Sequence, residues 1–130
     1  MKIKCIKEKL DDDQLSILGE YAHAKNSFSI SADKEYIVFG LTFEFGDLGH
    51  GCFVQILSDN NHLMHVPMVL FVTTDERVSK YWEIKSYPDG SVTLWPPSMY
   101  SEFYHDDLTE DVIDVIEDFK RVKQQILSEF

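Results

Sequence analysis

Apolar and polar residues alternate along several short stretches of this chain, and this pattern predicts a protein built mainly of β-strands. The clearest alternation covers residues 35–45, where every second residue from Ile37 to Phe45 is apolar. We expect these side chains to share one face of a single strand, because successive side chains in a strand point to opposite faces. Residues 2–10 open with a similar alternation of lysines and apolar residues, which predicts a first strand.

Turn residues divide the middle of the chain into further strands. Residues 52–57 predict a strand that lies between a glycine-rich turn and the polar turn at 58–61. Residues 68–73 form an uninterrupted apolar run, which is typical of a central strand covered on both faces. Residues 80–87 and 91–95 predict a hairpin, because the Pro-Asp-Gly sequence between them is a strong turn signal.

Two segments have the periodicity of helices. Leu15, Leu18, Tyr21 and Ala22 predict a short helix over residues 14–24, after three aspartates that can cap it. The main helix is predicted over residues 109–128. Its apolar residues recur at intervals of three and four, at Val112, Val115, Ile116, Phe119, Val122 and Ile126.

The N-terminus of this main helix has two candidate caps. Thr109 is the first choice, and Asp107 competes with it because Glu110 would complete a capping box. Together these elements predict a single α+β domain over residues 1–130. Its expected architecture is an antiparallel meander sheet of about five or six strands, with the C-terminal helix packed on one face and a short N-terminal helix.

Composition narrows the class of protein. The chain has 130 residues and is 44% hydrophobic, which is enough for a core. Its two cysteines, Cys5 and Cys52, make no disulfide framework and fit a reducing compartment. The N-terminus is too charged for a signal peptide, and no apolar run approaches the roughly 18 residues of a membrane span. We therefore expect a cytoplasmic protein that inserts into no membrane.

The charge is distributed unevenly. The formal net charge is -11, and the segment from Glu102 to Asp118 holds eight carboxylates and no Lys or Arg. Such a field repels nucleic acid and attracts a basic partner. Acids in the first turn of a helix stabilise its dipole, which explains only the acids in that turn. For the other acids, the alternative to a partner-binding role is that they keep the protein soluble.

No recognised catalytic or metal-binding motif competes with this segment. His50, Cys52, His62 and His65 are residue types that bind zinc, but an i, i+3 pair on a strand points to opposite faces. The glycine-rich loop at 46–51 lacks the Walker lysine and the dinucleotide spacing. Cysteines in apolar strands are usually small core residues and not nucleophiles. We expect no enzyme activity, no catalytic residue, no metal and no cofactor.

Aromatic residues lie beside the acids. Trp95, Tyr100, Phe103 and Tyr104 surround a Pro-Pro pair and lead into the acidic stretch. Tyrosine and tryptophan are enriched in protein interfaces because they combine apolar area with a polar group. The sequence thus predicts a partner-binding face that consists of Tyr100, Tyr104, Asp106, Asp107, Glu110, Asp111 and Asp114.

The C-terminal half contains three recognisable stretches: SKYWE at 79–83, DGSVTLWPP at 89–97, and YHDDL at 104–108 followed by the acidic helix. In these stretches the chain resembles the small immunity proteins of bacterial polymorphic-toxin and contact-dependent growth inhibition systems. The resemblance implies a cytoplasmic protein that binds one cognate toxin domain and neutralises it. Many such toxins are nucleases with basic clefts, which an acidic inhibitor would cover.

Two other classes of function remain open at this stage. One is a small enzyme that uses His50 or His105 with a nearby carboxylate. The other is an acidic adaptor subunit that binds a different basic partner.

Overall fold

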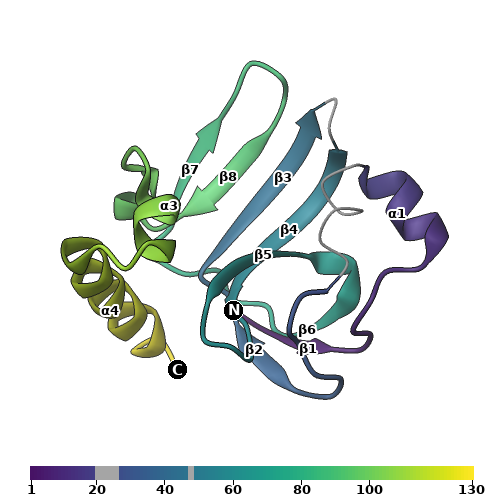
Figure 1. Ribbon diagram of the computed structural model, residues 1–130, viewed down its shortest axis with the longest axis horizontal. Coiled ribbons are helices and arrows are strands. Elements are labelled where there is room, and N and C mark those ends of the chain that lie inside the picture. The colour runs from purple at the N-terminus through teal and green to yellow at the C-terminus, as the bar shows by residue number, and fades with distance from the viewer. Residues whose placement is uncertain (20–26, 47–48) are drawn as a thin grey trace.

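The computed structural model describes residues 1–19, 27–46 and 49–130, and within them the chain forms two antiparallel sheets and three α-helices (Figure 1). The smaller sheet has the order β2-β1-β6, from Glu35–Ile37, Lys2–Cys5 and Phe71–Asp75. The larger sheet has the order β5-β4-β3-β8-β7. Its strands are Leu63–Pro67, Gly49–Leu57, Gly40–Gly46, Val92–Trp95 and Glu83–Ser86.

Three α-helices and two 3-10 turns complete the described residues. The helices are α1 (Asp12–Leu18), α3 (Tyr104–Thr109) and α4 (Ile113–Leu127). The turns are η1 (Met68–Leu70) and η2 (Pro97–Tyr100). In Figure 1, α3 and α4 lie on the opposite side of the molecule from α1. The predicted α+β class, its antiparallel strands and its C-terminal helix are confirmed, although the strands are divided between two sheets and not joined in one meander.

The predicted strand at 35–45 is two strands in different sheets. β2 pairs with β1, whereas β3 pairs with β4 and β8. The backbone changes sheet at Val38 and Phe39, where the Val38 amide donates to the carbonyl of Met1 (3.1 Å) and the Phe39 amide to that of Gln55 (2.8 Å). The alternation continues through this change, so it gave no signal of the break. Phe45, expected on the buried face, is 62% exposed.

The predicted central strand at 68–73 is wrong. Met68–Leu70 form the 3-10 turn η1, and β6 then begins at Phe71 as an edge strand of the smaller sheet. Val69 and Val72 are exposed. An apolar run alone does not distinguish a buried strand from a turn followed by an edge strand.

The N-terminal helix α1 is shorter than predicted. Its N-cap is Asp11, which accepts from the Gln14 amide, while the Gln14 side chain accepts from the Asp11 amide in a capping box. Gly19 ends the helix with a φ of 85°, a conformation that favours glycine. Tyr21 and Ala22 of the predicted helix lie outside the described residues.

The predicted helix at 109–128 is interrupted. Asp111 adopts a left-handed conformation with a φ of 59°, which separates α3 from α4. Thr109 and Asp107 are therefore not N-caps, because both lie within α3. The Thr109 hydroxyl donates to the His105 carbonyl (3.0 Å), and the Asp107 carbonyl accepts from the Val112 amide (3.0 Å). The N-cap of α4 is Val112, whose side chain forms no capping hydrogen bond.

The core has two parts. The larger cluster lies between the two sheets and includes Ile3, Val38, Val54 and Ile56. The smaller one attaches the C-terminal helices to the larger sheet. It consists of Phe39, Met99, Tyr104, Phe119, Val122 and Ile126. The predicted buried face of the helix is thus confirmed from Phe119 onward, Ile116 is half-buried, and Val112 is exposed.

Candidate functional site

The acidic residues are carried by the corner that η2, α3 and α4 form. We use the term acidic corner for residues 102–118. Backbone hydrogen bonds define its shape: the Asp107 amide donates to the Phe103 carbonyl (2.8 Å), and the Ile116 amide donates to the Val112 carbonyl (3.0 Å). The turn at Asp111 between the two helices places acids from both of them on one part of the molecule.

Most carboxylates of the acidic corner are exposed and unpaired. Within the described ranges, no ion pair involves five exposed acids, namely Glu102, Asp106, Glu110, Asp111 and Asp114. Glu117 and Asp118 are different, because they pair with Lys120 (3.4 Å) and Arg121 (2.7 Å). Asp107 is half-buried. The corner therefore presents a negative field that the described part of the protein does not neutralise.

Apolar side chains interrupt this acidic surface. Phe103 is 63% exposed, Val112 40% and Ile113 73%. Ile113 was not predicted as a surface residue and Val112 was predicted on the apolar face, because residues 109–128 were predicted to form one continuous helix. Phe103 also has a φ of 61°, a strained conformation for a bulky side chain, and such strain is concentrated at functional positions.

Tyr104, one of the two tyrosines predicted to contact a partner, is a core residue. Its side chain is 5% exposed, and its hydroxyl donates to Oδ2 of Asp118 (2.9 Å). Burial raises the pKa of Tyr104, and the Asp118 carboxylate raises it further. The expectation that Tyr104 is exposed is wrong, because the residue opens α3 on the side that faces Phe119 and Met99.

Tyr100, the other tyrosine, is half-exposed and fixed in place. Its hydroxyl donates to the Glu83 carbonyl (2.8 Å) and lies 2.8 Å from the hydroxyl of Thr93. Its ring stacks on Trp95 with centroids 5.1 Å apart. Tyr100 thus remains part of the predicted surface, together with the exposed acids.

A buried polar layer holds α3 over the larger sheet. Nε2 of His105 lies 2.9 Å from Oε1 of the fully buried Gln55, and the His105 ring is 5.0 Å from that of Trp95. Trp95 in turn donates to the Thr42 hydroxyl (3.1 Å). Burial lowers the pKa of His105. His105 is therefore a neutral structural contact at physiological pH, oriented by an amide and not by a carboxylate.

The remaining histidine and cysteine candidates are dispersed. His50 and Cys52 lie on β4 opposite Phe45 and Phe43, and His62 is exposed in the turn before β5. His65 on β5 lies 5.5 Å, ring to ring, from His105. Among the described residues, no group of three potential ligands is close enough together to hold a metal ion.

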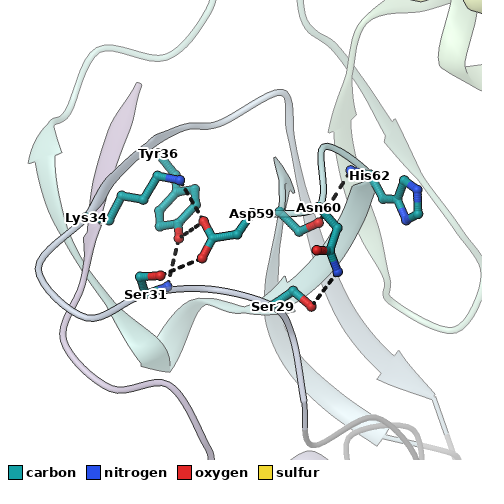
Figure 2. A network of polar contacts seen from close by, with 8 residues as sticks. Ser29, Ser31, Lys34, Tyr36, Asp59, Asn60 and His62 are labelled. Atoms are coloured by element: carbon teal, nitrogen blue, oxygen red, sulfur yellow. Dashed lines mark hydrogen bonds and ion pairs between the residues drawn. The ribbon is translucent and has the colours of Figure 1, made fainter.

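Figure 2 shows a second polar network, which the sequence pattern did not predict. Asp59, in the turn between β4 and β5, accepts from Lys34 (2.6 Å), Ser31 (2.5 Å) and the hydroxyl of Tyr36 (2.8 Å). These bonds, led by that of Lys34, lower the pKa of Asp59 to about 2. Burial raises the pKa of Tyr36 to about 12. A carboxylate this acidic is a poor general base, and its contacts tie two loops together.

This network makes the stability of the fold depend on pH. Because the pKa of Asp59 is about 2 in the folded protein and 3.8 ordinarily, its stabilising effect is present above about pH 4 and lost as the pH falls toward 2. Asp59→Asn should cost about 1–2 kcal/mol at neutral pH and remove this part of the acid dependence. Urea denaturation between about pH 2 and 7 measures both effects.

Asp33→Asn is the matched control, since Asp33 is exposed in the loop of Ser31 and Lys34 and asparagine tolerates its left-handed φ of 67°. Equal acid dependence of the wild type and Asp59→Asn would contradict the proposed role of the network.

No protein-family model, curated protein or solved structure matches this chain. Across residues 1–19, 27–46 and 49–130, no helix has both the length and the apolar character needed to cross a membrane.

Proposed function

We propose that this chain is an immunity protein that binds a basic toxin domain, in particular a nuclease domain, and neutralises it through the acidic corner. One observation carries the proposal: within residues 102–114, three exposed apolar side chains lie among five exposed carboxylates that form no ion pair in the described part of the chain. Carboxylates alone fit a solvated surface. Their combination with Phe103, Val112 and Ile113 fits a protein interface, in which apolar anchors are surrounded by charge.

The charge of the acidic corner also supports the class of partner. A nuclease cleft is lined with basic residues that bind phosphates, and a row of carboxylates presents a similar pattern of negative charge. Opposite charges accelerate association, and this matters for a protein that must capture a toxin before the toxin acts. The acidic corner is suited to such a partner and unsuited to direct contact with nucleic acid.

The enzyme alternative has less support. His50 is exposed near the start of β4, and His105 of α3 is packed against Gln55. Neither histidine forms a hydrogen bond or an ion pair with a carboxylate among the described residues. An acidic adaptor for another basic partner would use the same surface, and only the identity of the partner distinguishes it from an immunity protein.

The test uses the toxin domain that the neighbouring gene is expected to encode. Asp106, Glu110 and Asp114 are reversed to Lys together, and association and dissociation rates are measured at low and high salt. At low salt, association should become about 10-fold slower or more, because electrostatic steering is lost. At high salt the difference should shrink, since screening weakens the steering of the wild type too.

The matched control reverses three exposed acids on other elements, Glu8, Glu44 and Glu76. Each triple variant changes three charges by two units and so takes the net charge from -11 to -5. The control should slow association much less. Equal slowing by both variants would mean that net charge alone matters, and unchanged affinity in the first variant would place the interface outside the acidic corner.

A further inference from the structure

A pocket of about 300 Å³ lies at the edge of the acidic corner, between the β7–β8 hairpin and the segment from η2 to α3. It is lined by aromatic rings, which include Tyr87, Trp95, Tyr100 and Phe103, and by the acids Glu102 and Asp106. Lys85 and His105 also line it. The pocket therefore combines ring surfaces with carboxylates, a combination suited to an organic cation.

The aromatic part of this pocket is preorganised. The Tyr100 hydroxyl is held by the Glu83 carbonyl and by Thr93, and its ring lies against Trp95 at an interplanar angle of 26°. Because these contacts already fix the ring, a ligand that packs on it pays little additional entropy for ordering it.

One cation of the chain already uses these rings. The Lys85 ammonium lies 5.4 Å from the centroid of the Tyr100 ring and 5.8 Å from that of Tyr87. Both distances are within the range of a cation–π contact. No ion pair joins Lys85 to Glu102 or Asp106, and both of these exposed acids are unpaired among the described residues. The pocket thus attracts a cation to its rings while two of its carboxylates remain without a partner.

We propose that this pocket receives an arginine side chain of the basic partner. The guanidinium would stack on the aromatic rings and donate hydrogen bonds to Glu102 and Asp106. Arginine suits the site better than lysine, because its planar group stacks on rings and donates to carboxylates in a fixed fork. This inference deepens the proposed function and depends on it, since it names the group by which the partner is anchored.

The test uses N-acetyl-arginine amide as a probe for the isolated protein, with N-acetyl-citrulline amide as its neutral counterpart of the same shape. Amide NMR titration should give saturable shifts around Tyr100, Phe103 and Asp106 with the arginine probe, with a Kd of about 1 mM for a ligand this small. The citrulline probe should bind at least about 10-fold more weakly.

Variants locate the binding. Phe103→Asn removes a ring while keeping a residue that tolerates the φ of 61°, and it should weaken arginine binding by about 2- to 30-fold. Glu102→Gln with Asp106→Asn should weaken it similarly, whereas Lys85→Met should strengthen it by removing the competing cation. Phe45→Ala is the control, since Phe45 is exposed outside the pocket and should have no effect.

The outcomes separate this inference from the proposed function. Equal binding of both probes, no saturable binding of the arginine probe, or shifts spread over the whole acidic corner would overturn the arginine pocket. Toxin binding that is unchanged in Phe103→Asn would overturn it while leaving the immunity role intact. Conversely, a pocket that binds arginine in a protein that does not bind the toxin would refute the immunity role alone.

Discussion

Phe119→Ala is expected to lower the free energy of unfolding by about 3–5 kcal/mol, as for other large-to-small changes of a buried aromatic residue. Phe119 is 9% exposed, and its ring lies 5.6 Å from that of Phe39. Truncation of this ring would leave a cavity in the smaller core cluster, lined by side chains such as Phe39 and Val122. Since α4 attaches to the sheet through Phe119, Val122 and Ile126, loosening this contact weakens the whole C-terminal segment.

Urea denaturation followed by circular dichroism measures this loss. Ile113→Ala is the matched control on the same helix, because Ile113 is 73% exposed and its truncation should change stability by less than about 0.5 kcal/mol. A loss below about 1 kcal/mol in Phe119→Ala would mean that α4 packs on the sheet by another face.

Tyr104→Ala should have a comparable effect, about 3–5 kcal/mol, and the effect should be on folding and not on the interface. The ring belongs to the core cluster, and the hydroxyl contacts Asp118. Tyr104→Phe keeps the ring and loses only this hydrogen bond, so it should cost about 0.5–1.5 kcal/mol. Comparison of the two variants separates the packing of the ring from the contact of the hydroxyl.

Rates of toxin binding complete this test. Because Tyr104→Phe keeps the ring and removes only the contact with Asp118, it should bind the toxin domain with nearly the affinity of the wild type. Faster dissociation of Tyr104→Phe from the toxin domain, without a change in stability, would contradict this and would mean that the Tyr104 hydroxyl contacts the partner.

Local signals explain which parts of the fold could be predicted. The hairpin of β7 and β8 and the cap of α1 were predicted correctly, because turn and capping residues act within a few positions of the chain. The change of sheet at Val38 and the interruption at Asp111 could not be predicted. Both leave the apolar periodicity intact. Hydrogen bonds to Met1 and Gln55, which are distant in the sequence, fix the change of sheet, and the left-handed φ of Asp111 interrupts the helix.

The residues of the candidate surface also divide into those whose position the sequence could predict and those whose position it could not. Exposure of Asp106, Glu110 and Asp114 follows from the cost of burying charge, which the sequence alone reveals. Tyrosine suits both a core and an interface, so the burial of Tyr104 could not be read from its identity. The exposure of Val112 follows from the interruption of the helix, and it could not be predicted because the interruption itself could not.

Strand β7 has a further consequence for the behaviour of the molecule. It is an edge strand of four residues among the described strands, and all four are exposed, Ile84 among them. Edge strands of this kind recruit strands from other molecules unless charged side chains interrupt them. Glu83 and Lys85 flank Ile84, so they protect the protein from self-association and aggregation along this edge. The lysine that contacts the aromatic pocket therefore also helps to keep the molecules apart at high concentration.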